Sequence, residues 1–273
     1  MSDILGYKGK RVVVTGCFSG MGEATARMLL SLGAEVHGLD YKDCALPLAS
    51  FQQTDLRDPA SMDAAVAGIG GKVDALFNCA GLPQTFPPLD VMKVNYIGTR
   101  YLTEKLATLM GEGSSIASIS STGGLGWSRR VPVLMGLLKL EGFDAALKWC
   151  EENPDLVREG YSISKEAVIV WTMMTSSHLI KKGIRINCTL PGPTQTPMMK
   201  EFEAASSKDV IEFATQPINR RSTPDEQAGP LVFLNSALAT YVNGVVLPAD
   251  GGFMGGIATG QIDMSKMLPP QAA

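Results

Sequence analysis

The sequence predicts an α/β fold: a doubly wound parallel sheet with helices on both faces, in a single domain over residues 1–273. Short, continuously apolar runs such as Val12–Val14 recur along the chain, and such runs suit strands that are covered on both faces. Helical segments separate these runs, and this alternation is typical of a parallel sheet. No linker, composition break or internal repeat divides the 273 residues.

The individual elements follow from the same patterns, in chain order. Runs rich in apolar and β-branched residues are predicted as strands, and longer segments with helical spacing as helices. The predicted strands are Arg11–Thr15, Glu35–Leu39, Val73–Asn78, Ser115–Ser120, Ile184–Leu190 and Val245–Pro248. The predicted helices are Met21–Leu32, Val91–Met110, Tyr161–Lys181 and Pro224–Leu234.

Two segments depart from this rhythm. Residues 122–160 contain a glycine-rich start, an apolar run at Val131–Leu138 and a helical run at Phe143–Cys150. We expect them to form a helical insertion immediately before the helix that starts at Tyr161. Residues 251–273 form a C-terminal tail that begins with the glycine-rich run Gly251–Gly260, flexible enough to fold over a site or onto a partner.

Composition excludes several classes of function. A net charge of −3 and a pI near 5.5 argue against a nucleic-acid partner. The longest apolar runs fall short of the ~18 residues that a membrane span needs, and no basic cluster indicates a membrane anchor. The first residues lack the features of a secretory signal, so we expect a cytoplasmic protein. Five scattered cysteines and two histidines predict no disulfide framework and no metal site.

A glycine-rich turn joins the first predicted strand to the first predicted helix. Gly16, Gly20 and Gly22 have the spacing Gly-x-x-x-Gly-x-Gly, which differs from the common Gly-x-Gly-x-x-Gly fingerprint. Glycines let a backbone approach a pyrophosphate, whose charge then lies at the helix N-terminus. With Ser19 and Met21, these residues indicate a Rossmann-type dinucleotide site; a plain strand–turn–helix connection is the alternative.

Asp40, at the end of the second predicted strand, bears on the choice of cofactor. A carboxylate there can accept hydrogen bonds from both hydroxyls of an adenosine ribose. It would repel the additional phosphate of NADP by about 1–4 kcal/mol at contact distance. We therefore expect NAD, with NADP less favoured, although Lys42 is nearby. A loop-capping role for Asp40 is the alternative.

Tyr161 and Lys165 lie at the start of the longest predicted helix. Four residues apart, their side chains project from one helix face. An ammonium near a phenol favours the phenolate, so we expect Lys165 to lower the pKa of Tyr161. A phenol tuned in this way can exchange the alcohol proton while hydride moves to or from a nicotinamide. The pair predicts an NAD-dependent oxidoreductase that interconverts an alcohol and its carbonyl; a chance surface pair is the alternative.

Several motifs together resemble the classical short-chain dehydrogenases/reductases, over residues 8–252. They are the glycine-rich turn, Asn78-Cys79-Ala80-Gly81, Asn95 in Lys93-Val94-Asn95-Tyr96, Ser120-Ser121 at a strand end, Tyr161 with Lys165, and the run from Pro191 to Pro197. The resemblance implies a dinucleotide-dependent enzyme acting on CH–OH groups.

The resemblance also implies a role for each matched residue. Ser121 would hydrogen-bond the substrate oxygen, Tyr161 would be the acid/base, Lys165 would bind the nicotinamide ribose, and Asn95 would hold a water of the proton path. Ser120 is the alternative to Ser121, because successive side chains of a strand point to opposite faces. Further implied cofactor contacts are Asp55, Leu56, Asn78, Ala80, Gly81, Pro191, Gly192, Thr194 and Thr196.

One departure from the family pattern concerns the substrate. Ser121 and Tyr161 are forty positions apart, far more than is typical of the family, because residues 122–160 intervene. This spacing resembles the subgroup that contains bacterial 3α-hydroxysteroid dehydrogenase/carbonyl reductase and coniferyl-alcohol dehydrogenase, which implies a homodimer or homotetramer. An apolar, aromatic wall predicts a hydrophobic, ring-bearing alcohol or carbonyl substrate. The predicted wall residues are Leu125, Trp127, Val131, Met135, Met198, Met199, Phe202 and Phe213.

Other functions fit the sequence less well. A family relative that catalyses epimerisation, dehydration or dehalogenation, or a non-catalytic dinucleotide-sensing regulator, would typically lose one of the residues Asn95, Ser121, Tyr161 and Lys165. A serine hydrolase would need a Gly-x-Ser-x-Gly turn and a suitably placed histidine. A zinc alcohol dehydrogenase would need clustered Cys and His ligands. The retained residues favour the dehydrogenase.

Overall fold

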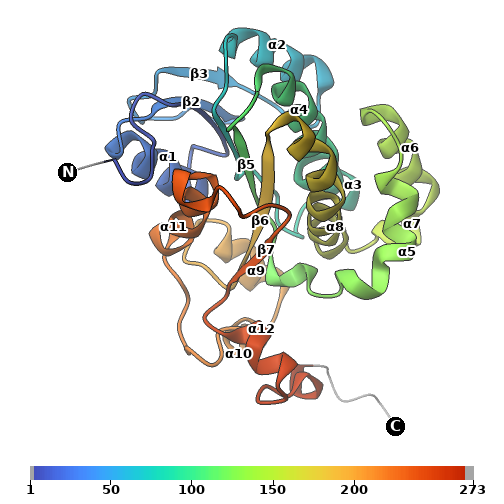
Figure 1. Ribbon diagram of the computed structural model, residues 1–273. Coiled ribbons are helices and arrows are strands. Elements are labelled where there is room, and N and C mark those ends of the chain that lie inside the picture. The colour runs from blue at the N-terminus through green and yellow to red at the C-terminus, as the bar shows by residue number, and fades with distance from the viewer. Residues whose placement is uncertain (1–2, 268–273) are drawn as a thin grey trace.

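Residues 3–267, which the computed structural model describes, form a seven-stranded parallel sheet with helices on both faces (Figure 1). The strand order is β3-β2-β1-β4-β5-β6-β7, so the direction of winding reverses between β1 and β4. In such sheets ligands bind beyond the carboxyl ends of the strands at this reversal. The strands are β1 (Arg11–Thr15), β2 (Glu35–Asp40), β3 (Ser50–Gln53), β4 (Ala75–Asn78), β5 (Ser115–Ile119), β6 (Arg185–Pro191) and β7 (Val246–Ala249).

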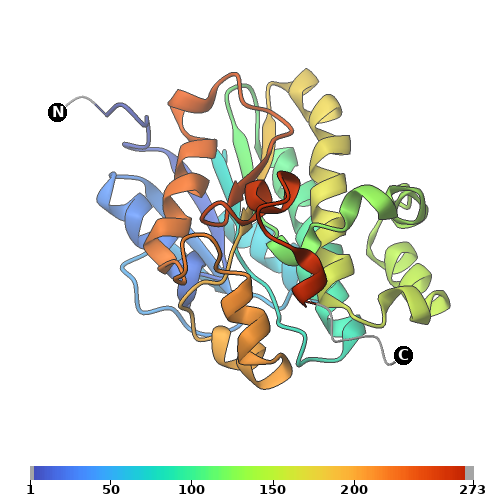
Figure 2. The ribbon, with the colours of Figure 1, turned by 90° about the horizontal axis from the view of Figure 1, so that it is seen from below.

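The helices form a layer on each face of the sheet, and Figure 2 shows the sheet between them. Helix α1 packs against α11 on one face, whereas α2, α4 and α8 cover the other. The helices are α1 (Gly20–Ser31), α2 (Pro59–Ile69), α3 (Pro88–Met92), α4 (Thr99–Leu106), α5 (Trp127–Leu138), α6 (Phe143–Glu152), α7 (Pro154–Val157), α8 (Tyr161–Leu179), α9 (Met199–Ala205), α10 (Lys208–Phe213), α11 (Pro224–Asn235) and α12 (Phe253–Ala258).

Strand β1 shows how the sequence pattern produces these two layers. Val13 belongs to the apolar cluster that includes residues of α2, α4 and α8. Val12 and Val14 belong to the cluster that includes residues of α1 and α11. Successive side chains of a strand point to opposite faces, so a continuously apolar strand requires helices on both sides. The predicted fold class is therefore confirmed.

Most predicted elements lie within two residues of the observed ones, but one predicted helix is interrupted. The segment predicted as a helix over Val91–Met110 consists of α3, a π-helical stretch at Lys93–Gly98 and then α4. Asn95, a predicted catalytic residue, lies in the π-helical stretch, and such stretches often occur at functional sites. The elements β3, α2, α9, α10 and α12 were not predicted.

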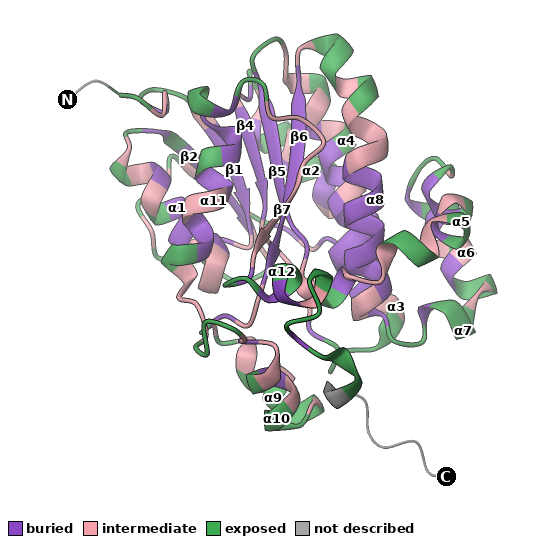
Figure 3. Ribbon diagram, turned by 60° about the horizontal axis from the view of Figure 1, so that its bottom comes forward, coloured by how far each residue is buried: buried purple, intermediate pink, exposed green. Residues whose placement is uncertain are grey.

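Residues 122–160 form the predicted helical insertion. After a short 3₁₀ turn at Thr122–Gly124, helices α5, α6 and α7 follow one another and end just before α8. Helix α5 packs against α8, and Leu134, Leu137 and Leu138 of α5 are buried in the core on that side. Figure 3 shows α5–α7 as a partly exposed group beside α8, of which the central part, Ile163–Thr172, is buried.

The C-terminal tail is more ordered than predicted. Within Gly251–Gly260, which we expected to be flexible, Phe253–Ala258 form α12, and the Phe253 ring packs at 6.0 Å from the Phe213 ring. The predicted tail residues 268–273 lie outside the described residues. Within residues 3–267, no helix has the length and apolar character needed to cross a membrane.

Candidate active site

A cleft of about 600 Å³ lies at the winding reversal, beyond the carboxyl ends of β1, β2 and β4. This volume is within the range of small-molecule and cofactor sites. Of the predicted cofactor contacts, those that line the cleft are Gly16, Ser19, Asp40, Asp55, Leu56, Ala80 and Gly81.

The glycine-rich turn has a backbone that only glycine permits. Gly16 has a φ of +72°, and a Cβ atom there would lie 2.7 Å from the amide nitrogen of Ala80. A Cβ at Gly22 would collide with the carbonyl oxygen of Gly16. Thr15 Oγ1 accepts hydrogen bonds from the amides of Cys79 and Ala80, which ties the turn after β1 to the turn after β4.

Helix α1 begins in this turn and offers an anion site. Ser19, in extended conformation, precedes the helix, and its side chain makes no capping hydrogen bond among the described residues. The first amides of the helix are therefore available to an anion, and the helix dipole favours negative charge at this end. Gly20 approaches the next loop over the cleft, since a Cβ there would lie 3.2 Å from Cγ2 of Thr196. These features fit a pyrophosphate group.

Asp40 links the glycine-rich turn to the loop after β2. Its Oδ2 accepts a hydrogen bond from the Phe18 amide and its Oδ1 one from the Lys42 amide, both at 2.9 Å. Cations stand nearby: Lys42 Nζ lies 5.2 Å from the centre of the Phe18 ring, and Arg57 also lines the cleft. This part of the cleft therefore carries the Asp40 carboxylate together with the cations Lys42 and Arg57.

Asp55 lines the cleft, and its carboxylate is engaged by Arg57. Its Oδ2 accepts from Arg57 Nη2 at 2.8 Å and its Oδ1 from Arg57 Nε at 2.9 Å. These hydrogen bonds lower the pKa of the Asp55 carboxyl. Leu56, the next residue, is buried and lines the cleft with its apolar side chain.

Tyr161 and Ser121 face each other across Gly123. A Cβ at Gly123 would lie 3.2 Å from Tyr161 Cε1 and 3.4 Å from Ser121 Oγ. Tyr161 is the first residue of α8, and Gly160 before it has a φ of +48° and passes close to Pro88. Gly160 therefore allows the sharp turn that aims the first side chain of α8 at the strand end that carries Ser121.

Ser120 and Ser121 point to different surroundings. Ser120 is buried and its Oγ donates to the carbonyl oxygen of Lys165 at 2.8 Å. Ser121 Oγ accepts from the Gly123 amide at 3.0 Å and lies on the Tyr161 side. The geometry therefore groups Ser121, not Ser120, with Tyr161.

Lys165 and Asn95 stand behind Gly81 at the inner end of the cleft. A Cβ at Gly81 would lie 3.3 Å from Asn95 Oδ1 and 3.7 Å from Lys165 Nζ. Lys165 is buried, its Nζ donates to the Ile119 carbonyl at 3.0 Å, and burial lowers its pKa to about 8. Asn95 Oδ1 accepts from the Leu82 amide at 2.7 Å, which fixes the loop after β4.

The expected direction of the Tyr161 pKa is wrong in this structure. Burial raises the pKa of the Tyr161 phenol, and the facing Ser121 hydroxyl lowers it only in part. Lys165 Nζ lies 5.7 Å from the centre of the Tyr161 ring and is directed at the Ile119 carbonyl. The ammonium therefore does not depress the phenol pKa as the sequence spacing suggested.

The described residues that line the cleft do not include the four predicted catalytic residues. These four lie next to the inner end of the cleft. The Phe202 ring of α9 contacts the Tyr161 ring edge-on, with centres 5.0 Å apart, and so covers the phenol. Pro197 and Met198, just before α9, line the cleft. Helix α9 and the loop before it therefore adjoin both the cleft and Tyr161.

Asn78 lies away from the cleft, in contrast to the prediction. Its side chain is buried between β4, α4 and β5, where Nδ2 donates to Thr103 Oγ1 at 2.9 Å and to Ser118 Oγ at 3.1 Å. As the last residue of β4, Asn78 directs its side chain into the core, whereas Cys79 and Ala80, which follow the strand, line the cleft.

Half of the predicted substrate wall also lies elsewhere. Four of its members belong to the insertion and pack against the core cluster between α5 and α8, namely Leu125, Trp127, Val131 and Met135. Met198 lines the cleft and Phe202 contacts Tyr161. Sequence reasoning missed Arg57, Leu82 and Phe86 as cleft residues, because β3 and the loop after β4 were not recognised.

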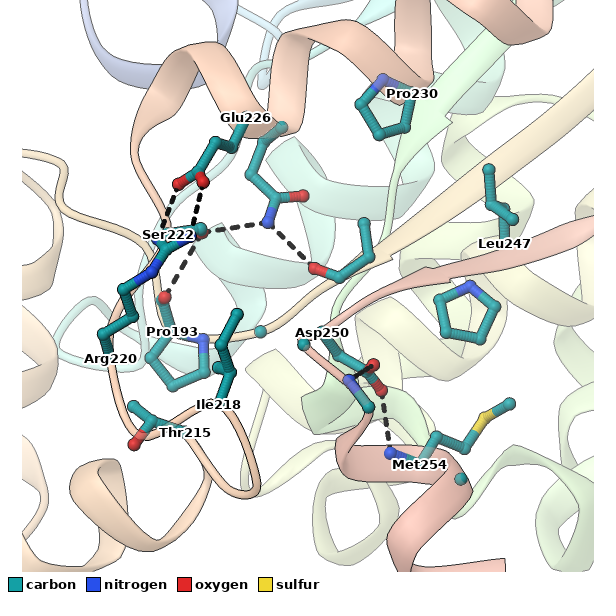
Figure 4. A pocket seen from close by; sticks show the side chains of 17 residues that line it. Pro193, Thr215, Ile218, Arg220, Ser222, Glu226, Pro230, Leu247, Asp250 and Met254 are labelled. Carbon is teal, nitrogen blue, oxygen red and sulfur yellow. Dashed lines mark hydrogen bonds and ion pairs between the residues drawn. The ribbon is translucent and has the colours of Figure 1, made fainter.

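A second cavity, of about 720 Å³, lies beside the loop that follows β6 (Figure 4). Gly192 lines it, and Thr194 Oγ1 is hydrogen-bonded to Ser222, another lining residue. Its carboxylates are held within the protein, Asp250 by the amides of Gly252 and Met254 and Glu226 by Arg220. Pro191 ends β6 beside Ala249. Of the predicted contacts Pro191, Gly192 and Thr194, Gly192 therefore lines this second cavity, and none of the three is among the residues that line the active-site cleft.

The fold and this site define a dinucleotide-binding oxidoreductase. A family model described as short chain dehydrogenase matches residues 10–133, and one described as Enoyl-(Acyl carrier protein) reductase matches residues 155–254. Coniferyl-alcohol dehydrogenase from Pseudomonas sp. (strain HR199 / DSM 7063) is 36% identical over 244 residues, which cover 89% of this chain and 96% of that protein. The chain therefore belongs to the short-chain dehydrogenase family, as its motifs predicted, and is a dehydrogenase that acts on alcohol or carbonyl groups.

Solved structures agree with this assignment. The 3-alpha-hydroxysteroid dehydrogenase from Pseudomonas sp. B-0831, complexed with NADH, is similar with a TM-score of 0.78 and 26% identity, over 92% of this chain and 99% of that one. A putative NAD(P)-dependent gluconate 5-dehydrogenase from Beutenbergia cavernae, with bound NADP, has a TM-score of 0.71 and 26% identity over the same shares. The chain thus has the fold of a nucleotide-dependent dehydrogenase, whereas these relatives hold different nucleotides.

Proposed function

We propose that the protein is an NAD-dependent dehydrogenase that interconverts a hydrophobic, ring-bearing alcohol and its carbonyl, with Tyr161 as the acid/base. The observation that carries this proposal is the position of Tyr161 opposite Ser121, beside the buried Lys165 and Asn95 at the inner end of the cleft. Bound NAD supplies the hydride acceptor of this chemistry.

Each residue of this cluster has a distinct task in the proposed mechanism. Ser121 orients the substrate oxygen toward Tyr161, which takes the proton on oxidation and returns it on reduction. Lys165, whose Nζ is near Asn95 Oδ1, binds the nicotinamide ribose in this proposal. Asn95 holds the loop after β4 and a water molecule that passes the proton onward from Lys165.

Asp40 supports NAD over NADP. Its carboxylate lines the end of the cleft that receives the adenosine in this proposal, where it accepts hydrogen bonds from the ribose hydroxyls. It would repel an additional phosphate by about 1–4 kcal/mol at contact distance. Lys42 and Arg57 work in the opposite direction, but Arg57 is already paired with Asp55. The amides at the start of α1, with Ser19, Gly20, Met21 and Gly22, hold the pyrophosphate in this proposal.

The walls near Tyr161 support an apolar substrate. Phe202 contacts the phenol, and Leu82, Phe86 and Met198 line the adjoining cleft. Such a surface suits a planar or aromatic ring, since ring contacts and a thioether contribute favourable packing. The coniferyl-alcohol and hydroxysteroid dehydrogenases, which resemble this chain, act on ring-bearing compounds by name, and this agrees with the proposal.

We also place the protein in the cytoplasm as a homodimer or homotetramer. Five free cysteines suit a reducing compartment. Phe233, Leu238 and Tyr241 are large apolar side chains that are exposed near the end of α11, where a second copy would cover them. A monomeric mass in light scattering would remove the second part of this proposal.

The proposed activity is tested with purified protein, NAD and a panel of aromatic, steroid and sugar alcohols, by following NADH absorbance. We expect NADH formation with ring-bearing alcohols and little with sugars. NADH formation with sugars alone would overturn the substrate class. Conversion of substrate without net NADH formation would instead indicate an epimerase or dehydratase, and binding of NADH without any conversion would indicate a regulator.

A further inference from the structure

Two cysteines lie close together beneath the adenosine end of the cleft. Cys17 is in the glycine-rich turn, between Gly16 and Phe18, and Cys44 is in the loop after β2. The Cys44 thiol donates to the carbonyl oxygen of Cys17 at 3.2 Å. Burial raises the pKa of the Cys17 thiol, and the nearby Cys44 side chain raises it further. The two sulfur atoms are therefore neighbours across two separate loops.

The surroundings of the pair allow an oxidant to reach one thiol and leave the other protected. Cys17 is fully buried, and its sulfur occupies space that Gly38 leaves free, because a Cβ at Gly38 would lie 2.8 Å from Cys17 Sγ. Cys44 is only partly buried and is the less enclosed residue of the pair. A partly accessible cysteine next to a second, resolving cysteine is the arrangement found in oxidation-sensitive sites.

We propose that Cys17 and Cys44 form a reversible disulfide in the presence of hydrogen peroxide, and that this bond weakens dinucleotide binding. The proposal concerns a modification site that the catalytic mechanism does not use.

The chemistry balances with one peroxide molecule. The Cys44 thiolate attacks one peroxide oxygen, the O–O bond breaks and hydroxide leaves, which gives a sulfenic acid on Cys44 and, with the thiol proton, one water. The Cys17 sulfur then attacks the Cys44 sulfur, the S–S bond forms, the S–O bond breaks, and the oxygen leaves as water with the Cys17 proton. The two sulfur atoms together lose two electrons, which the peroxide oxygens gain. A thiol reductant reverses the reaction by exchange.

The bond would move the two loops that hold Asp40. A disulfide requires the sulfur atoms to approach to about 2.05 Å, much closer than non-bonded contact, with a fixed dihedral angle. The Phe18 amide, next to Cys17, and the Lys42 amide, two residues before Cys44, both donate to the Asp40 carboxylate. Drawing the loops together displaces these donors, and therefore the carboxylate and the turn that receive the adenosine.

The first test identifies the bond. The full-length protein is treated with hydrogen peroxide, alkylated, digested and mapped by mass spectrometry without reduction. We expect a Cys17–Cys44 cross-linked peptide that disappears with dithiothreitol. Cys44→Ser should abolish it. Cys150→Ser, which replaces a buried cysteine in α6, far from the pair in sequence, should leave it unchanged. In Cys17→Ser, dimedone should trap a sulfenic acid on Cys44. Only over-oxidised or unmodified Cys44 in the folded parent would overturn the proposal.

The second test measures the consequence by NADH fluorescence titration of the same samples, with NADPH in parallel. Oxidation should raise the Kd of the parent by roughly fivefold or more, reversibly, and leave that of Cys44→Ser within about twofold. A cross-linked protein whose Kd is unchanged would overturn the claimed effect. If the reduced protein binds neither nucleotide, the proposed function fails, whereas the peptide map still decides whether the disulfide forms.

Discussion

Tyr161 and Ser121 lie forty positions apart in sequence, yet they flank a single glycine, Gly123. A Cβ atom at Gly123 would lie 3.2 Å from Tyr161 Cε1 and 3.4 Å from Ser121 Oγ. The residues between them leave the sheet as three helices and return to start α8. The insertion therefore lengthens the chain between the two side chains without separating them. This relationship lets the protein keep a shared family arrangement while it adds a helical group outside α8.

Gly22→Ala should abolish tight dinucleotide binding. The added Cβ would collide with the Gly16 carbonyl, and backbone on both sides of the contact prevents an easy adjustment. Gly229→Ala in α11 is the matched control, because a Cβ there meets no atom within 4 Å. Isothermal titration with NADH and a thermal melt would separate lost binding from lost folding. Wild-type affinity in Gly22→Ala would contradict the role of the turn.

Asp40→Ala should weaken NAD binding and improve NADP binding relative to NAD by roughly tenfold or more, because it removes the repulsive carboxylate and leaves Lys42 and Arg57 in the lining of the cleft. Steady-state kinetics with both nucleotides give the ratio of kcat/KM values. Asp43→Ala, a nearby carboxylate that does not line the cleft, should leave the ratio unchanged. A parent enzyme that already prefers NADP would refute the assignment of NAD.

Lys165 should make the stability of the protein depend on pH above neutrality. Burial lowers its pKa from 10.5 to about 8, so between these values the unfolded chain binds more protons than the folded one. Stability then rises with pH in this window, and the destabilising contribution of the buried ammonium is fully present below pH 8.

Lys165→Met lacks this titration. The free energy of unfolding of both proteins is measured with urea at several pH values. As pH rises from 8 to 10.5, that of the parent should increase relative to that of the variant, by a few kcal/mol at most. Parallel stability curves across that window would contradict the shifted pKa.

Phe202→Ala should weaken recognition of aromatic alcohols while dinucleotide affinity stays the same. Its ring contacts Tyr161 edge-on at 5.0 Å, where a substrate ring would approach the phenol. We expect KM for an aromatic alcohol to rise by roughly three- to tenfold. Phe213→Ala, whose ring packs on Phe253, is the matched aromatic control. An equal loss of NADH affinity in Phe202→Ala would show that this ring belongs to the cofactor site.

The sequence predicts the layered fold well because hydrophobic periodicity determines which faces are buried. Val12, Val13 and Val14 alone imply helices on both sides of β1, and the structure has them. The strand β3, Ser-Phe-Gln-Gln, was missed because it is a short, polar edge strand without an apolar run. Asn95 lies in a π-helical stretch, which no periodicity of a regular helix reveals.

The site was predicted less completely, because side-chain direction depends on tertiary packing. The motif that contains Asn78 was recognised, yet that side chain is directed into the core. Spacing placed Tyr161 and Lys165 on one helix face but gave no information on the Ile119 carbonyl that binds the ammonium. The partnership of Asp55 with Arg57 likewise depends on a loop conformation.

The most direct test of the proposed mechanism is the single-turnover rate of Tyr161→Phe with saturating NAD and an aromatic alcohol that the parent oxidises. The variant keeps the ring beside Phe202 and lacks only the hydroxyl opposite Ser121. We predict a rate at least about a hundredfold lower than that of the parent, with the Kd for NADH unchanged. A rate within a few-fold of the parent would show that another group carries the proton, and the proposed mechanism would be wrong.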